Sequence, residues 1–314
     1  MRCPALADLP PPPPHRTGWP WTAESATVPC STPGGLAWPR LTVVTPSYNQ
    51  ADFLEATIRS VLLQGYPNLE YIVIDGGSND GSRAIIEKYR PWLAHAVSQP
   101  DDGQYAAINA GFRVSSGAVM TWLNSDDMCA INSFWAVGGI FGDLRDTVDW
   151  ITGIPAMWDR DGNLGLILPR PKLDRLLLRW GAYDGVTLNF VQQEGTFWSR
   201  QLWEAAGGCL DTSFAFAADY ELWCRLAEHS DLYGASALLA GFRRHPRQKT
   251  ARAMGAYMHE MAVCRASRPG GETERYWLAR GIKRRLARAL YHARRERNLI
   301  FYDPSASRWI TASS

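Results

Sequence analysis

The sequence has few long apolar runs. The opening segment MRCPALADLPPPPPHR lacks the continuous apolar stretch of a signal peptide, and no later run is long and uncharged enough to cross a bilayer. These absences predict a cytoplasmic protein. A large excess of charge of one sign is also lacking, because 33 Lys and Arg residues are balanced by 31 Asp and Glu residues, which gives a net charge of +2. This balance argues against a protein that binds nucleic acid through its overall charge.

Motifs for structural zinc and for dinucleotides are missing as well. The six cysteines form no C-x-x-C pair and are interpreted as reduced, small apolar side chains (Cys3, Cys30, Cys129, Cys209, Cys224 and Cys264). No G-x-G-x-x-G follows an expected strand, so dinucleotide binding is unsupported. The first expected strand continues into TPSYNQ, which lacks the Gly- and Lys/Arg-rich loop that nucleotidyl transfer needs for a triphosphate.

Composition divides the chain into three parts. Residues 1–39 are rich in Pro, Gly, Ser and Thr, and the run Pro10–Pro14 favours polyproline II, so this part is predicted to be a proline-rich N-terminal arm. A docking motif for a partner is the alternative interpretation of the arm. Residues 40–250 carry strand and helix patterns and form the predicted main domain. Residues 251–314 are predicted to be a C-terminal helical extension.

Residues 40–145 alternate between strand and helix patterns. Apolar runs predict strands near 41–45, 71–75, 95–98 and 118–123, and helical spacing marks 51–64, 78–90 and 104–114. Pro46 is expected to end the first strand. The alternation predicts an α/β fold with a Rossmann-like, doubly wound, mostly parallel sheet. Beyond residue 145 the alternation stops, and a hairpin around Asp161 and Gly162 predicts a smaller antiparallel element.

Carboxylates follow two of the expected strands. Asp75 ends the second strand before two glycines, and Asp126 and Asp127 follow the strand AVMTWL. Because ligands of open parallel sheets bind beyond the carboxyl ends of the strands, these side chains are candidates for one site. The adjacent like charges of Asp126 and Asp127 favour a divalent cation with oxygen ligands. The alternatives are a turn residue at Asp75 and an Asx turn over 124–127.

A third carboxylate is a candidate general base. A metal ion can stabilise the charge of a nucleotide diphosphate leaving group, whereas an attacking hydroxyl needs a separate base within hydrogen-bond reach. Asp219 precedes an amphipathic helix and stands beside the small residues Ala217 and Ala218, which leave space for a substrate. The alternative interpretation is an ordinary helix N-cap.

The order of these motifs resembles the inverting, GT-A-type glycosyltransferases of family 2. The resemblance covers roughly residues 40–250, and TPSYNQADFLEATIRSVLLQ is similar to the opening strand and helix of that family. It implies a GT-A fold and transfer of a sugar from a nucleotide diphosphate donor to an acceptor hydroxyl. It also implies a divalent cofactor, Mn²⁺ or Mg²⁺.

The resemblance implies roles for residues on the donor side. IDGGSNDGS is similar to the family's Asp-Gly-Ser-x-Asp-Gly turn, which implies that Asp75 contacts the nucleobase. Pro46 and Tyr48 match positions that line the same pocket. WLNSDD resembles the family's D-x-D metal motif in the variant with Asn first, which implies metal and diphosphate binding by Asp126 with support from Asp127.

Later motifs imply roles on the acceptor side. The segment ADYEL resembles the family's acidic catalytic motif and makes Asp219 the expected base. QEGTFWSRQLWEAAGG resembles the segment before it, so Glu194 and Trp198 are expected to line the acceptor side. FRRHPRQKT is similar to a late loop whose histidine, here His245, closes over the diphosphate or the metal.

Three positions depart from the family pattern. Asn124 replaces the first carboxylate of the metal motif, and Ala106 and Ala110 stand where relatives commonly carry Asp and Lys. Other polar side chains nearby are therefore expected to contact the donor (Asp102, Gln104, Asn109 and Asn124). A helix residue that bonds locally is the alternative for Asn109. The departures also leave a second hypothesis open, a degenerate nucleotide-sugar-binding protein without transferase activity.

Residues 275–297 predict a basic amphipathic helix. Apolar residues at Leu278, Ile282, Leu286 and Leu290 form one face, and arginines crowd the remainder. Such a helix can lie on an anionic membrane surface, which predicts a peripheral location at the inner face of the membrane. The favoured alternative packs the apolar stripe on the main domain.

Together these patterns predict an inverting glycosyltransferase. The expected donor is a UDP-sugar, on the resemblance alone, and the expected acceptor is a saccharide or a lipid-linked saccharide. A role in the synthesis of cell-surface or exported polysaccharide or glycolipid is expected. No nucleic acid partner is expected.

Overall fold

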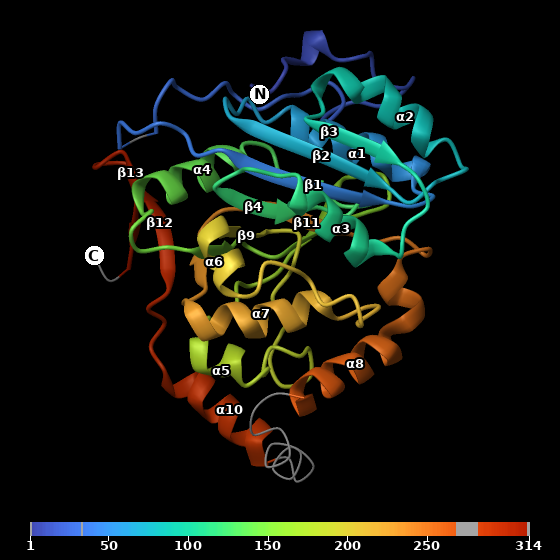
Figure 1. Cartoon of the computed structure of the whole chain (residues 1–314). Helices are drawn as coiled ribbons and strands as arrows, with labels where there is room; N and C mark the ends of the chain where they lie inside the picture. The colour runs from blue at the N-terminus through green and yellow to red at the C-terminus, as the bar shows by residue number, and fades with distance from the viewer. Residues whose placement is uncertain (1, 33, 268–281, 313–314) are drawn as a thin grey trace.

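A computed structural model of the chain describes residues 2–32, 34–267 and 282–312 (Figure 1). Within these residues, nine strands form a large sheet in the order β13-β12-β10-β6-β9-β4-β1-β2-β3. The strands are β1 Leu41–Ser47, β2 Leu69–Asp75, β3 His95–Ser98, β4 Val119–Trp122, β6 Trp150–Thr152, β9 Thr196–Ser199, β10 Tyr233–Ala235, β12 Leu299–Asp303 and β13 Arg308–Thr311. Only β9 and β13 pair antiparallel with their neighbours in the described sheet, which confirms the prediction of a mostly parallel sheet.

Alternating side chains of the central strands serve two cores on opposite faces of the sheet. Val43 of β1 and Tyr71 of β2 belong to one core, and their neighbours Val44 and Ile72 belong to the other. A strand buried on both faces requires this continuous apolar run, because successive side chains point to opposite sides. The sequence runs LTVVT and YIVID therefore predict a sheet covered by helices on both faces.

Helices cover each face (Figure 1). The first core includes side chains of α1 Ala51–Leu62, α2 Ser82–Tyr89 and α4 Ser133–Asp143. The second includes side chains of α3 Gln104–Arg113, α5 Arg175–Arg179, α6 Arg200–Ala205 and α7 Ala218–His229. Two short 3-10 helices are also described. The helix η1 Leu6–Asp8 lies in the N-terminal arm, and η2 Arg90–Trp92 follows α2. The three layers match the doubly wound architecture expected from the sequence.

Pro46 does not end the first strand, contrary to the prediction. It lies within β1 in register with Ile74 of β2. The pairing of β1 with β4 already ends at Val44, whose carbonyl accepts the backbone N–H of Leu123. The amide that proline lacks would face this unpaired side, so β1 continues without losing a ladder hydrogen bond.

The described residues also form a second, smaller sheet. It contains β5 Met128–Cys129, β7 Ala156–Trp158, β8 Leu164–Ile167 and β11 Ala240–Arg243, in the order β5-β11-β7-β8. β7 and β8 form the hairpin expected around Asp161 and Gly162. The sheet is mixed rather than antiparallel throughout, because β11 and β7 pair parallel. The sequence could not show this pairing, since these two strands are far apart along the chain.

The N-terminal arm packs against α1. Arg59 of α1 is fully buried, and its guanidinium donates hydrogen bonds to the carbonyls of Pro10, Pro20 and Trp21 at 2.8–2.9 Å. A buried guanidinium needs such acceptors, because it carries five N–H donors and remains charged. Residues rich in proline supply carbonyls with few competing amides, which explains how an arm without strands is held in place.

The C-terminal part differs from the predicted helical extension. It contains α8 Lys249–Ser267 and α10 Ile282–Ala293, but β12 and β13 then join the large sheet. In α10, Ala287 and Leu290 pack against the second core, whereas Leu286 is 49% exposed. This contact agrees with packing on the main domain. Residues 275–281 of the predicted amphipathic helix lie outside the described residues. No helix among the described residues has the length and apolar character needed to span a bilayer.

Candidate active site

Three loops meet at the carboxyl edge of β1, β2 and β4. Asp75 ends β2 and is fully buried; its carboxylate accepts hydrogen bonds from the Ser78 backbone N–H at 2.9 Å, the Ser78 hydroxyl at 2.5 Å and the Ser98 hydroxyl at 2.6 Å. The Ser78 hydroxyl also accepts the backbone N–H of Asn49 at 2.7 Å. Asp75 therefore organises the turn after β2 and joins it to the turn after β1.

Two predicted donor residues flank this turn. Pro46 is buried within β1, and Tyr48 beyond it is 64% exposed. Asp102 lies exposed in the loop before α3. The neighbouring Asp101 is the one that faces the turn, because a Cβ added at Gly76 would lie 3.0 Å from its carboxylate. The sequence places two adjacent aspartates in this loop and does not reveal which one points inward.

The turn after β4 is fixed by hydrogen bonds from four directions. Asn124 donates from its Nδ2 to Asp127 at 3.1 Å and accepts at its Oδ1 from Gln104 of α3 at 2.7 Å. The other carboxylate oxygen of Asp127 accepts the backbone N–H of Arg243 at 2.8 Å. The Thr57 hydroxyl of α1 lies 2.7 Å from the Asp127 carbonyl. Asn124 thus holds the turn in shape, a role that needs an amide and that a carboxylate could not fill.

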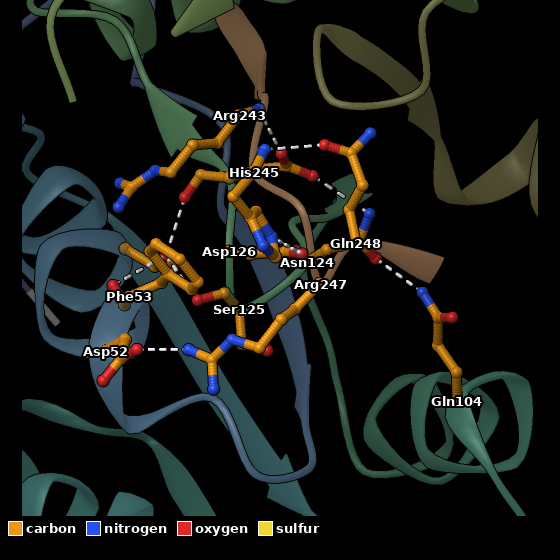
Figure 2. A network of polar contacts seen from close by, with 12 residues as sticks. Asp52, Phe53, Gln104, Asn124, Ser125, Asp126, Arg243, His245, Arg247 and Gln248 are labelled. Atoms are coloured by element: carbon orange, nitrogen blue, oxygen red, sulfur yellow. Dashed lines mark hydrogen bonds and ion pairs between the residues drawn. The ribbon is translucent and has the colours of Figure 1, made fainter. Parts of the chain in front are cut away.

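Asp126 meets the late loop through His245 (Figure 2). The Asp126 carboxylate lies 3.0 Å from His245 Nε2, and its side chain keeps 18% exposure while that of His245 keeps 1%. The His245 ring packs on Phe53 of α1 with ring centroids 4.3 Å apart. Arg247 forms an ion pair with Asp52 of α1. The late loop is thereby attached to α1, with His245 directed at the metal motif.

Glu194 and Asp127 are deeply buried carboxyls close to other negative charges. Burial raises the pKa of Glu194 to about 8, and the charges of Asp219 and Asp126 add to the rise. Burial likewise raises the pKa of Asp127 well above its ordinary range, with contributions from Glu194 and Asp126. Glu194 Oε2 is buried and has no hydrogen-bond partner among the described residues. The neighbouring Gln193 anchors this segment by donating to the Trp122 carbonyl at 2.8 Å.

Asp219 stands in the first turn of α7. Burial raises its pKa to about 6, although hydrogen bonds from the Tyr220 backbone and the Tyr257 hydroxyl oppose the rise. The Tyr257 hydroxyl of α8 lies 3.3 Å from both carboxylate oxygens. A carboxyl with this pKa is largely ionised at neutral pH and still able to accept a proton, as a general base requires.

The segment before Asp219 is held by α8. Glu260 accepts the backbone N–H groups of Ala215, Phe216 and Ala217 at 2.8–2.9 Å. Lys249 donates to the Ala215 carbonyl and, at 3.3 Å, to Gln104. Sequence reasoning did not identify Tyr257, Glu260 or Lys249 as part of the site. Tyr257 and Glu260 belong to a helix beyond the recognised motifs, and Lys249 lies in the segment FRRHPRQKT, where the resemblance implies a role for His245 alone.

Comparison with known proteins decides the family. A sequence profile for Glycosyl transferase family 2 matches residues 42–177. An uncharacterized glycosyltransferase of Mycobacterium tuberculosis is 30% identical over 192 residues, which cover 60% of this chain and 69% of that protein. The chain belongs to glycosyltransferase family 2. A glycosyltransferase of Bacillus subtilis named for teichuronic acid biosynthesis is 37% identical over 92 residues, 28% of this chain and 36% of that protein.

Solved structures share the fold of this family 2 glycosyltransferase. Staphylococcus aureus TarS in complex with UDP-GlcNAc matches with a TM-score of 0.54 at 15% identity, over 79% of this chain and 73% of that one. The mannosyltransferase PcManGT from Pyrobaculum calidifontis, in complex with GDP-Man and Mn²⁺, matches with a TM-score of 0.52 at 19% identity, over 87% and 74%. These likenesses confirm the expected GT-A architecture.

Most of the predicted site residues of this glycosyltransferase lie together. Asp126, Asp127, Glu194 and Asp219 influence one another's charge, although they come from three separate stretches. Asp75 lies at the same edge of the sheet, one strand away from the 124–127 turn, since β1 pairs with both β2 and β4.

Two predicted residues serve the framework instead. Trp198 is fully buried in β9, where its ring contacts Trp122 and Trp223, so it does not line an acceptor site. The alternation of β9 turns its side chain into the second core. Asn109 exchanges two hydrogen bonds with the Leu210 backbone at 2.8 and 2.9 Å, so its side chain connects α3 to a distant segment and does not bond locally.

The residues present fit a metal ion only in part. No three His, Cys, Asp or Glu side chains within the described residues form a complete set of ligands. Asp126 and His245 nevertheless bring one carboxylate oxygen and one imidazole nitrogen within 3.0 Å of each other. An octahedral ion bound by two protein ligands keeps positions for the oxygens of a diphosphate. A set that includes imidazole suits a transition metal such as Mn²⁺ better than Mg²⁺.

Proposed function

We propose that this glycosyltransferase inverts the configuration of the sugar that it transfers, with Asp219 as the general base. The observation that carries the proposal is the raised pKa of Asp219 together with its hydrogen-bond partners. Burial raises the pKa of Asp219 to about 6, and the Tyr257 hydroxyl lies 3.3 Å from its carboxylate oxygens, whereas Asp75 accepts three hydrogen bonds of 2.9 Å or less. A desolvated carboxylate that few donors stabilise is a stronger base than a well-bonded one.

The transfer is a single displacement at C1 of the sugar. The acceptor hydroxyl gives its proton to Asp219 as its oxygen forms a bond to C1. The bond between C1 and the diphosphate oxygen breaks, and its electron pair leaves with the nucleoside diphosphate. Attack on the face opposite the leaving group inverts C1. Asp219 belongs to the rigid first turn of α7, and Glu260 fixes the three preceding amides, so the base is held in position before the substrate binds.

We assign the donor side to the loops after β1, β2 and β4. A UDP-sugar is the proposed donor, with the nucleobase near Asp75 and Tyr48 and the diphosphate near Asp126. Asp126 and His245 would hold Mn²⁺ or Mg²⁺, with Asp127 supporting the turn. The bound ion would supply positive charge to the leaving diphosphate. The complex of TarS with UDP-GlcNAc and that of PcManGT with GDP-Man and Mn²⁺ support a nucleotide-sugar donor of this class.

Glu194 is assigned to the acceptor. With a pKa of about 8 it is mostly protonated at neutral pH, so it can donate a hydrogen bond as well as accept one. Its unpartnered Oε2 is suited to an acceptor hydroxyl. We propose a saccharide or lipid-linked saccharide acceptor and a role in cell-surface or exported polysaccharide or glycolipid synthesis. The Bacillus subtilis relative named for teichuronic acid biosynthesis supports this class.

Release of nucleotide tests the proposal. The full chain is incubated with UDP-glucose, UDP-galactose, UDP-GlcNAc or GDP-mannose, with Mn²⁺, Mg²⁺ or EDTA, and free nucleoside diphosphate is measured. We expect a UDP-sugar to be turned over only with a divalent ion, and NMR of a transferred product to show the anomer opposite to that of the donor. Retention of configuration contradicts inversion. Donor binding without turnover across the panel would instead support the hypothesis of a degenerate nucleotide-sugar-binding protein. The departures from the family pattern at Ala106, Ala110 and Asn124 favour that hypothesis.

A further inference from the structure

A groove lies between the N-terminal arm and the small sheet. Its volume is about 680 Å³, within the ~300–1,000 Å³ typical of ligand sites. Four tryptophans line it, Trp19 of the arm, Trp135 of α4, Trp158 of β7 and Trp309 of β13, and we call it the tryptophan groove. Figure 1 shows α4 and β13, which contribute two of these rings, side by side.

The lining of the tryptophan groove is uncharged. None of the described side chains that line it is ionisable, and its polar groups are amides and hydroxyls such as those of Asn132, Asn163 and Ser236. An anionic ligand would be expected to meet lysine or arginine, which are absent from this lining. The groove therefore suits a neutral ligand that has both apolar and hydroxyl surfaces.

A neutral sugar has these two surfaces. Its ring presents a face of C–H groups that can pack on an indole, and its rim of hydroxyls can bond to amide side chains. The half-exposed ring of Trp135 and the exposed side chains of Ile131 (43%) and Leu164 (45%) supply apolar surface open to a ligand. Asn132 uses its Oδ1 to accept the Ala26 backbone N–H, which leaves its amide nitrogen to donate.

The groove is joined to the carboxylate site by β5. The indole N–H of Trp19 donates to the Cys129 carbonyl at 2.9 Å, and that of Trp158 donates to the Met128 carbonyl at 3.2 Å. Both bonds fix the short strand that directly follows Asp127. Two strand residues, Met128 and Cys129, separate Asp127 from Ala130 of the groove, a span of about 10 Å.

We infer that the tryptophan groove binds a neutral saccharide chain, the part of the acceptor glycan that lies away from the reacting hydroxyl. The inference rests on the proposed function for its biological meaning, but saccharide binding itself does not need turnover. Binding one part of a long acceptor at the groove raises the effective concentration of the rest near Asp219. Short acceptors that cannot reach the groove then have a higher KM with little change in kcat.

Binding of oligosaccharides tests the inference directly. The full chain is titrated with neutral gluco-, galacto-, manno- and N-acetylglucosamine oligomers of two to six sugars, followed by tryptophan fluorescence and calorimetry. Leu164→Arg places a cation in the groove, and Leu166→Arg is the matched control, because both side chains are 45% exposed on β8 and only Leu164 lines the groove. We expect at least one oligomer series to bind, with affinity at least tenfold lower in L164R and unchanged in L166R.

The outcomes separate this inference from the proposed function. Thermal stabilisation by UDP and Mn²⁺ is expected to be equal in both variants, which shows that each is folded. Saccharide binding without any donor turnover supports the groove and contradicts the transferase mechanism. Equal saccharide affinity in L164R and L166R overturns the groove, as does the absence of binding throughout the panel. A change in oligomeric state in L164R, without saccharide binding, also overturns it and assigns the surface to a second copy of the chain.

Discussion

Asp75, assigned to the proposed donor side, and Asp219, the proposed base, are held by the protein in opposite ways. Asp75 is fully buried and accepts three hydrogen bonds of 2.9 Å or less. Asp219 accepts its side-chain hydrogen bonds from Tyr257 at 3.3 Å, and burial raises its pKa to about 6. Glu194, beside it, has one carboxyl oxygen without a partner in the described part of the chain.

The difference separates binding from proton transfer. Three hydrogen bonds hold the Asp75 carboxylate in one orientation, which suits the recognition of a ligand. Desolvation without compensating donors favours the protonated form, so Asp219 and Glu194 can exchange protons near neutral pH. Asp75 is thus fixed by three donors, whereas burial raises the pKa values of Asp219 and Glu194.

The largest effect is expected from Asp219→Asn. An amide cannot take the proton of the attacking hydroxyl, so kcat should fall by about 10²–10⁴-fold. Binding of UDP with Mn²⁺, measured by calorimetry, should stay within a factor of about two. Asp211→Asn, on the exposed loop before α7, is the matched control and should keep full activity. Normal turnover in the Asp219 variant contradicts its role as base.

Asp126→Ala should lower the affinity for UDP, which Asp219→Asn is expected to leave nearly unchanged. Loss of the carboxylate beside His245 removes one of the two proposed ligands, so Mn²⁺-dependent affinity for UDP should fall by about 10–100-fold. Affinity measured in EDTA should change little. If the variant binds UDP with Mn²⁺ as tightly as the native chain, the metal does not sit at Asp126.

Glu194→Gln should stabilise the apo protein at alkaline pH. Below pH 4.5, the ordinary pKa of glutamate, Glu194 is protonated in both the folded and the unfolded chain, so it does not lower the free energy of unfolding. Between pH 4.5 and 8 the unfolded chain releases the proton that the folded chain retains, so the free energy of unfolding falls as pH rises. Above pH 8 the loss of unfolding free energy is complete, roughly 5 kcal/mol for a pKa shift from 4.5 to about 8. Thermal melts in EDTA at pH 4 and 9 check this; an equal gain at both values would indicate a packing effect.

Tyr257→Phe should have the smallest effect. The hydroxyl stabilises ionised Asp219, so its loss should raise the pKa of Asp219 above about 6. The acid limb of the kcat profile should move to higher pH by a fraction of a unit, with a few-fold loss at pH 6 and almost none at pH 8. An unmoved limb with a uniform loss would assign Tyr257 to folding alone.

The donor half of the molecule was the more predictable from the sequence. Its strands are continuous apolar runs, Asp75 ends β2, and Asp126 and Asp127 stand in the turn after β4, so topology alone brings them to one edge. Pro46 was mispredicted because its effect on β1 depends on where β4 stops pairing.

The acceptor half depends on contacts between distant segments. Glu260 and Tyr257 belong to α8 and reach across to 215–219, which no local pattern reveals. Trp198 was mispredicted because a tryptophan after a motif residue can face a site or the core, and the register of β9 decides between them. The strands β12 and β13 are not predicted from the sequence, because the basic helix before them dominates the composition of residues 251–314.

The most direct test of the account is the position of manganese. Crystals grown with Mn²⁺ and UDP, measured at the manganese absorption edge, give an anomalous peak that needs no assumption about the mechanism. We predict the peak between Asp126 and His245, in contact with the diphosphate and on the side that faces Glu194 and Asp219. A peak bound to Asp75, or one with Asp219 among its ligands, would contradict the division between a binding side and a proton-transfer side.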